Sequence, residues 1–442
     1  MKSNPYIFFI SMIAAFGGLL FGFDIAIFSG TIPFIQPYYN LTEAQLGWTG
    51  SSLYIGCIIG TLITGYATDR LGRKIPLIFA AAIFTISSVL MGWAGSYSML
   101  IFWRIIAGIG VGAASMLSPL YIAEISPAAI RGRMVSINQL TVVIGILLAY
   151  LSNYILADFD NNWRWMFTSG AFPAIVFFVF VFFVPESPRW LITNGFEDKA
   201  AKVLTKVSPT ANAQEELTKM KSGVNAVVKG KWSDLFQPGI TFLVLLGVTI
   251  AVFQQISGAN AIFFYAPIIF EKAGMNVQDQ LFQQIMIGSI NLVFTVLAMQ
   301  LVDKVGRKKL MLAGAALMAL WLLLVGICYS YGWFEGYTLT ILVLVFIATY
   351  ATTLAPVTWV LISEIFPTRI RGLAVSLATG MLWVSCFALA YGFPVLIEWL
   401  DAAQTFYLFA GICAVYAVIL YRYAPETKGK TLEQFETESI RH

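Results

Sequence analysis

The sequence predicts an all-α integral membrane protein, with twelve transmembrane helices in two six-helix halves joined by a cytoplasmic helical segment. Its composition, the length of its apolar runs and a repeat of motifs between the halves support this fold class. Of the 442 residues, 59% are hydrophobic and only 11% are charged. Soluble domains average about 45–50% apolar and about 25% charged residues. We therefore expect most of the surface to face a lipid bilayer.

Twelve apolar runs approach or exceed the roughly 20 residues that a helix needs to cross a bilayer. The first six lie near residues 7–29, 44–67, 75–95, 99–123, 134–157 and 163–184, and the second six near 239–270, 281–303, 309–330, 337–363, 372–396 and 402–423. Membrane β-strands would alternate over about 10 residues, so a barrel is excluded. The predicted organisation is an N-terminal half (1–184), an intracellular linker (185–237), a C-terminal half (238–423) and a cytoplasmic tail (424–442).

The basic residues predict the orientation. Of the 27 lysines and arginines, Arg104 falls inside an apolar run, and Arg164 and Lys272 are expected in connections on the outer side. The others cluster at the N-terminus, in the linker, in the tail and in short turns. Lys- and Arg-rich short loops stay in the cytoplasm, so both termini are predicted to be cytoplasmic. The first apolar run is too long for a signal peptide and lacks a cleavage site before Asp24.

Other classes of protein are disfavoured by what the chain carries. Its four cysteines all fall within predicted helices, which favours reduced packing residues over disulfides or a metal cluster. The single histidine is His442, and no basic segment interleaved with aromatic residues indicates nucleic acid. The sequence shows no ring of charged residues of the kind that is typical of a channel. We predict no enzymatic activity, cofactor or metal.

Three motifs recur in the same order in each half. DRLGRK at 69–74 recurs as DKVGRK at 303–308; a Glu-x-x-Pro-x-x-x-Arg-Gly motif starts at Glu124 and again at Glu364; Pro-Glu-Ser at 185–187 recurs as Pro-Glu-Thr at 425–427. The chain is therefore a duplicated six-helix unit. Parallel repeats of this kind predict that one half rocks over the other around a site at their interface near the midplane.

The motifs resemble those of the sugar porter family of the major facilitator superfamily over essentially the whole chain. They are GYATDRLGRK at 65–74, RIIAGIGVG at 104–112, the segment from Glu124 to Arg133, PESPRWL at 185–191, QQISGAN at 254–260 and PETKGK at 425–430. The resemblance implies a bacterial-type, proton-coupled monosaccharide (hexose or pentose) transporter of the cell (inner) membrane that works by alternating access. We expect it to function as a monomer.

Two alternatives remain open beside proton symport. A passive sugar or polyol uniporter would share every feature except proton coupling. A membrane sugar sensor would need an output domain, and the linker and the tail after residue 423 are both short. Sensing is therefore disfavoured, and symport against uniport is the open question.

Charged residues at the cytoplasmic helix ends form a candidate gate. The carboxylate of Glu124 can pair bidentately with Arg131 or Arg133, and Glu364 with Arg371. We expect Asp69 at the N-terminus of the third helix, where the helix dipole favours negative charge. Alternatively, the charges only fix the topology. The resemblance implies a network that holds the halves closed on the inside in the outward-facing state; its members are Asp69, Arg70, Arg73, Glu124, Arg131, Arg133 and Glu186, with Asp303, Arg307, Glu364, Arg371 and Glu426.

The linker is predicted to be helical. Ala200, Val203, Leu204 and Val207 recur at helical spacing between lysines, which is typical of an amphipathic helix. A second helix is suggested over 217–224. The alternative is a solvated linker.

Two charged residues are predicted within the bilayer, Asp24 in the first helix and Arg104 in the fourth. A charge at the bilayer centre costs about 2.5–3.5 kcal/mol on insertion scales, so we expect the two to pair. Burial disfavours a carboxylate and a nearby guanidinium favours it. Movement of Arg104 could therefore switch proton binding at Asp24. The alternative is a permanent bridge between helices, but the resemblance supports coupling, because proton-coupled sugar porters carry Asp and Arg at these positions.

Amides in the seventh helix predict the kind of solute. Gln254, Gln255 and Asn260 interrupt an apolar span beside Gly258, and neighbours on a regular helix point about 100° apart. They can face one cavity only if the helix is broken, which Gly258 and Pro267 permit. Amides donate to and accept from hydroxyl groups without charge, so the predicted ligand is a small neutral sugar.

Further residues extend this site. Gln139 and Asn291 add amides, and Trp359 and Trp383 offer flat faces for a sugar ring. The resemblance places Gln139, Gln254, Gln255, Asn260, Asn291 and Trp359 at sugar-contacting positions, lined by Phe264 and Tyr350. The alternative is that the amides hold helices together. The chain also departs from relatives, with Leu382 and Ile146 at positions that are often polar and Gly170 where some coupled members carry an acid.

Overall fold

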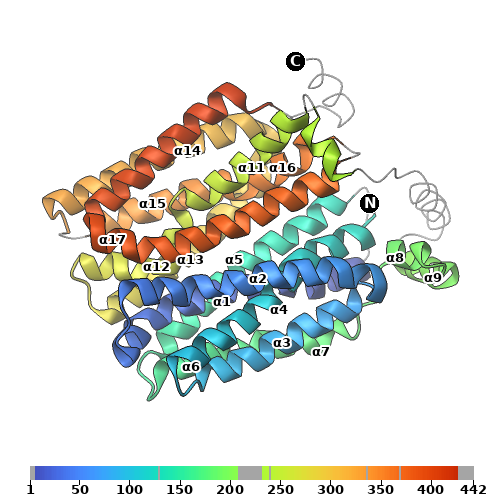
Figure 1. Ribbon diagram of the computed structural model, residues 1–442, viewed down its shortest axis with the longest axis horizontal. Helices are drawn as coiled ribbons and strands as arrows, with labels where there is room; N and C mark the ends of the chain where they lie inside the picture. The colour runs from blue at the N-terminus through green and yellow to red at the C-terminus, as the bar shows by residue number, and fades with distance from the viewer. Residues whose placement is uncertain are drawn as a thin grey trace. The chain divides into compact units, whose positions relative to one another are not determined.

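The computed structural model describes residues 5–127, 130–207, 231–237, 240–334, 337–367 and 370–426. Every regular element in these ranges is a helix, which confirms the predicted fold class. Among them, 11 helical stretches are long and apolar enough to cross a membrane. The longest, α17 (Arg371–Tyr423), contains the non-helical Asp401 (φ 66°, ψ 174°), where two arms of membrane length meet and run in opposite directions (Figure 1). The twelve predicted spans therefore all correspond to helices.

The chain divides into two compact units. The first contains Met1–Phe34 and Ser52–Val227, and the second contains Ile35–Ser51 and Val228–His442. The linker is thus divided, with its residues up to Val227 in the first unit and the rest in the second. The segment between the first two spans, which we expected in the N-terminal half, groups with the second unit.

The first unit packs its helices closely through small residues. A Cβ atom at Gly56 would lie 2.0 Å from the carbonyl oxygen of Ile105, and one at Gly112 would lie 2.2 Å from that of Cys57. Such positions let two backbones approach inside a membrane. The helices are α1 (Pro5–Tyr39), α2 (Glu43–Leu71), α3 (Lys74–Gly92), α4 (Tyr97–Ile125), α5 (Arg131–Leu156), α6 (Asn162–Ser169) and α7 (Ala171–Val181), of which the end of α1 and the start of α2 fall in the second unit.

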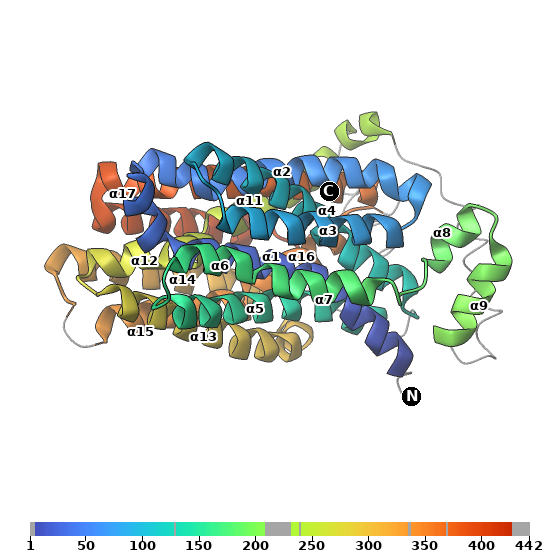
Figure 2. The same ribbon diagram turned by 90° about the horizontal axis from the view of Figure 1, so that it is seen from below.

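Two short helices follow α7 in the linker. They are α8 (Pro188–Thr193) and α9 (Glu197–Val207), and they lie beyond the end of α7 (Figure 2). Helix α9 buries Ala200, Leu204 and Val207, so the amphipathic helix predicted there is confirmed. The second helix predicted over 217–224 lies outside the described residues.

In the second unit, two predicted spans are each interrupted by a break between two helices. Gly258, with φ +91°, separates α11 from α12, and Thr353 separates α15 from α16 three residues before Pro356. A proline removes an N–H and its ring clashes with the carbonyl four residues earlier, which accounts for the second break. The elements are η1 (Trp232–Phe236), α11 (Ile240–Ile256), α12 (Ala259–Lys272), α13 (Val277–Val305), α14 (Arg307–Tyr331), α15 (Thr338–Thr352), α16 (Leu354–Ile365) and α17.

Two local expectations need correction. Arg164 lies in the first turn of α6, and Lys272 is the last residue of α12, so neither is in a connection. Arg164 Nη1 donates to the carbonyl oxygens of Gly92 and Ala94, each at 3.0 Å, which joins the start of α6 to the end of α3.

Candidate functional site

The break in the seventh span positions a buried amide pair. Gln254 and Gln255 lie in the last turn of α11 and are 4% and 6% exposed. Since Gly258 adopts a left-handed conformation, the chain turns before α12 begins, and Tyr265 (φ −126°) interrupts α12 two residues before Pro267. The Nε2 of Gln254 donates to the Tyr350 hydroxyl of α15 at 2.8 Å. The predicted break is therefore present and brings amides from both sides of it together.

Gln255 is the centre of the resulting network. Its Oε1 accepts from Asn260 Nδ2 and from the Cys386 thiol of α17, whose Sγ lies 2.9 Å away. Its Nε2 donates to Gln254 Oε1. Each side-chain amide carries two N–H donors, and these bonds use one on each of Gln254, Gln255 and Asn260. The network is uncharged and retains donors suited to the oxygens of a hydroxylated ligand.

The other predicted sugar residues lie apart from these hydrogen bonds. Asn291 is buried on α13 and its Oδ1 accepts from Thr295 at 3.5 Å. Phe264 is buried on α12, but the ring that meets Tyr350 edge-on at 6.1 Å is that of Phe263. Trp383 is buried on α17, Trp359 is 41% exposed on α16, and Gln139 is half-buried on α5 of the first unit.

The sequence reasoning missed two members of this site, Phe263 and Cys386. Cys386 follows Trp383 by three residues in α17, and residues three apart share a face of a helix. That spacing was the indication in the sequence that Cys386 lies on the same helix face as a predicted site residue. Contact with Gln255, on another helix, is a product of tertiary packing alone.

The two intramembrane charges lie together, as the sequence predicted. Arg104 of α4 and Asp24 of α1 are almost fully buried, with Arg104 Nη2 at 3.8 Å from Asp24 Oδ2. The guanidinium carbon lies 4.5 Å from the ring centroid of Phe28 and 6.0 Å from that of Phe167. These two rings were not predicted, although Phe28 follows Asp24 by four residues and so shares its helix face.

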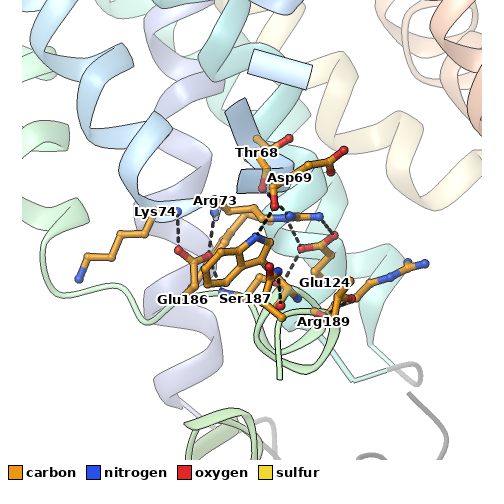
Figure 3. Close-up of polar contacts among 12 residues, drawn as sticks. Thr68, Asp69, Arg73, Lys74, Glu124, Glu186, Ser187 and Arg189 are labelled. Carbon is orange, nitrogen blue, oxygen red and sulfur yellow. Dashed lines mark hydrogen bonds and ion pairs between the residues drawn. The ribbon is translucent and has the colours of Figure 1, made fainter. Parts of the chain in front are cut away.

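A first carboxylate cluster, comprising Gly72, Arg73, Glu124, Glu186 and Ser187, joins the ends of α2, α3, α4 and α8 (Figure 3). Arg73 donates from Nε and Nη2 to the two oxygens of Glu124, each at 2.8 Å, and Ser187 Oγ donates to Glu124 at 2.5 Å. Glu186 accepts from the backbone N–H of Arg73 at 2.8 Å. A Cβ at Gly72, where φ is +83°, would lie 2.2 Å from Glu186 Oε2.

A second carboxylate cluster, comprising Gly306, Arg307, Glu364 and Glu426, repeats this arrangement in the second unit. Glu426 accepts from the backbone N–H of Arg307 at 3.0 Å, and Arg307 Nη2 donates to Glu364 at 3.3 Å. Gly306 has φ +104°, and a Cβ there would lie 2.7 Å from Glu426. The duplicated motifs thus build the same contacts twice.

The partner predicted for Glu124 was wrong. Its carboxylate binds Arg73, whereas Arg131 and Arg133 are exposed on α5. The left-handed Gly72 turns the chain between α2 and α3 and directs Arg73 to the end of α4, which sequence spacing does not indicate. In the second unit Arg371 donates to the Phe366 carbonyl at 3.1 Å.

Asp69 was also misplaced by the sequence. It lies in the last turn of α2, not at the start of α3, and its carbonyl oxygen accepts from Trp190 Nε1 at 3.0 Å. Arg70 places its guanidinium 4.6 Å from the centre of the Tyr66 ring. The side chain of Asp303 lies outside the described residues.

Membrane-length helices in two units, one carboxylate cluster in each, and an uncharged amide network at a broken helix define a membrane transporter built by duplication. Residues 10–438 match the family described as "Sugar (and other) transporter", and the chain belongs to this family. It is thus a multi-pass membrane protein of a transporter family.

Its relatives extend over nearly the whole chain. It is 37% identical to the arabinose-proton symporter of Bacillus subtilis (strain 168), with 98% of this chain and 95% of that protein aligned. It is 38% identical to the D-xylose-proton symporter of Escherichia coli (strain K12), with 98% and 96% aligned. An inward open structure of the E. coli xylose transporter XylE is similar with a TM-score of 0.87 at 36% identity, covering 98% of this chain and 100% of that one.

Proposed function

We propose that this protein is a secondary active transporter that carries a monosaccharide together with a proton by alternating access. The observation that carries the proposal is the buried pair of Asp24 and Arg104, in a chain whose relatives are named arabinose-proton and D-xylose-proton symporters. A buried carboxylate that can lose and regain its charge gives a transporter a way to carry a proton.

The sugar is bound by the amide network of the second unit. Gln254, Gln255 and Asn260 supply uncharged donors, and Tyr350 fixes the first of them. Neutral donors recognise hydroxyl and ring oxygens without the desolvation cost that a charged group would incur. Gln139, Asn291, Phe264, Trp359 and Trp383 complete the set of sugar-contacting residues in this proposal. Arabinose, xylose and glucose are the first substrates to test, because relatives are named for them.

The proposed cycle places the proton on Asp24 and the gate at the carboxylate clusters. Asp24 is protonated from the outside, the sugar binds, and both leave on the inside, where Arg104 again faces a carboxylate. The charges around Glu124 and Glu364 hold the cytoplasmic ends of the helices in the outward-facing state. In this proposal both termini are cytoplasmic, and one copy of the chain suffices for transport.

Transport by the purified protein in liposomes tests the function directly. Uptake of labelled xylose, arabinose and glucose is measured with and without an inward proton gradient. We expect accumulation above the outside concentration only with the gradient, together with sugar-dependent alkalinisation of the medium. Equilibration without accumulation would identify a uniporter, and no uptake of any of the three sugars would overturn the proposal for this class of substrate.

A further inference from the structure

Arg104 has aromatic neighbours as well as an acidic one. Its guanidinium carbon lies 4.5 Å from the Phe28 centroid and 6.0 Å from the Phe167 centroid, both within the range of cation–π attraction. All three side chains are at most 1% exposed. We call Phe28 and Phe167 the aromatic cradle.

The ion pair beside this cradle is loose. Arg104 Nη2 lies 3.8 Å from Asp24 Oδ2, whereas charge-assisted N–H···O⁻ bonds are about 2.7–2.9 Å long. Oδ2 of Asp24 has no hydrogen-bond partner among the described residues. The guanidinium is therefore shared between the ring faces and the carboxylate.

Few other charged side chains are buried in the same unit as Asp24. In the part of the first unit that the structure describes, the buried charged side chains are Asp24, Arg104 and Glu124. Glu124 lies at the far end of α4, about 30 Å from Arg104 at about 1.5 Å per helical residue. Among the described residues, the basic side chain within 4 Å of the Asp24 carboxylate is that of Arg104.

We propose that the aromatic cradle competes with Asp24 for the Arg104 guanidinium and thereby sets how readily Asp24 takes up the coupled proton. When Asp24 is neutral, the Arg104 charge stays buried, and each favourable contact to the guanidinium stabilises that state. The ring faces supply a partner that does not titrate, and Arg104 stays cationic throughout. The cradle thus stabilises the protonated carboxyl, and its loss would favour the carboxylate. This inference rests on the proposed symport function.

Fluorination of Phe28 isolates the contribution of the ring face. Phe28 is replaced by phenylalanine with one, two or three ring fluorines, which withdraws charge from the face while nearly keeping the shape. The pH dependence of sugar uptake and of sugar-driven proton uptake is then measured in liposomes. We expect the pH of half-maximal uptake to fall stepwise with fluorine number, by about 0.5 pH unit or more for three fluorines. Phe84, a buried ring on α3, receives the same substitutions as the control.

The outcomes separate this inference from the proposed function. A wild-type protein that shows no sugar-driven proton uptake overturns both. Normal coupling with an unchanged pH profile, or with a shift to higher pH, overturns the cradle alone. An equal shift in the Phe84 series would mean that fluorine acts through packing, which also overturns it. Equilibrium binding of sugar to every variant shows that the fold is retained.

Discussion

In the proposed mechanism Asp24 serves the proton and Gln255 the sugar, so single substitutions should separate their effects. Asp24 lies in the first unit beside Arg104, and Gln255 lies in the second unit within an uncharged network. Substitution of Asp24 should abolish proton coupling and retain sugar binding. Substitution of Gln255 should weaken sugar binding and retain proton coupling.

For Asp24→Asn we expect loss of uphill accumulation with retention of sugar binding and exchange. Asparagine keeps the size of the side chain but cannot titrate, and a proton gradient drives accumulation only if a proton moves with the sugar. Arg104 loses its counter-charge, which destabilises a buried pair, so expression and binding are measured first. A variant that binds normally and still concentrates sugar would show that Asp24 is structural.

For Gln255→Ala we expect weaker sugar binding without unfolding. Removing one partner from a buried hydrogen-bond network costs about 1–3 kcal/mol, or about five- to 150-fold in affinity. Titration calorimetry measures the affinity. Gln283→Ala is the matched control, because Gln283 is also a buried amide in the second unit and lies outside the network. Equal losses in both variants would contradict a specific role for Gln255.

Cys386 should contribute to sugar affinity through the hydrogen bond that its thiol donates to Gln255. We expect Cys386→Ala to raise the KM for sugar about two- to tenfold, since one hydrogen bond to Gln255 is lost. Cys386→Ser keeps a donor and should restore most of the affinity. The control is Cys413→Ala, because Cys413 donates to the backbone carbonyl of Ser257. If serine and alanine behave alike in transport assays, the thiol only fills space.

The sequence indicated the chemistry of these sites better than their contacts. Buried charges and amides stand out in apolar runs, since each needs a partner, so Asp24, Arg104 and the helix-seven amides were identified. The partners Phe28 and Cys386 are ordinary apolar-run residues. Their contacts with Arg104 and Gln255 depend on which helix faces pack together, and the hydropathy pattern does not indicate that.

At the scale of helices, the break at Gly258 determines where the amides point. The backbone there has φ +91°, a conformation that costs a non-glycine residue about 1–2 kcal/mol. The seventh span is thus two helices joined at the amide network of Gln254, Gln255 and Asn260.

For Gly258→Ala we expect sugar affinity to fall with a modest loss of stability. Relief of the left-handed strain would rotate α12 and move Asn260 away from Gln255. Gly411→Ala is the control, since Gly411 lies in α17 with open space around its Cβ position. Thermal unfolding and sugar binding are measured in detergent. Unchanged binding in Gly258→Ala would show that the break is dispensable.

The spans themselves were predictable because lipid imposes one requirement, namely that every backbone polar group be satisfied within its own helix. The runs near 372–396 and 402–423 were correctly separated at Asp401 for that reason. The interruption at Thr353 was not predicted. Pro356 hints at it, but many membrane helices tolerate proline, as Pro119 shows within α4.

For the whole molecule, the two carboxylate clusters share a plan and differ in strength. The Glu124 side chain is 5% exposed and paired bidentately with Arg73, whereas the Glu364 side chain is 26% exposed and lies 3.3 Å from Arg307 Nη2. Breaking a buried pair costs about 3–5 kcal/mol, and the cost falls towards the about 0–1 kcal/mol of an exposed pair as water reaches the charges.

We therefore expect Glu124→Gln to lower the thermal unfolding midpoint far more than Glu364→Gln. The exposed Asp69→Asn serves as the control and should leave the midpoint unchanged. Unfolding is followed by tryptophan fluorescence in detergent. If the two glutamate variants lower the unfolding midpoint equally, the burial of the ion pair does not determine its contribution to stability.

The placement of Glu186 and Glu426 bears on how the protein is made. Each is synthesised after the spans of its own half and at or next to the end of its cluster. The first cluster is complete once Ser187 has been synthesised, before any of the second six spans exists. Domains generally fold as units, N-terminal first. The contacts of the first cluster can thus form within the nascent N-terminal bundle. The segment Ile35–Ser51, in contrast, packs with helices of the second unit, which are synthesised later. Truncation after the linker should therefore give a membrane-inserted bundle in which the segment Ile35–Ser51 remains accessible to proteases.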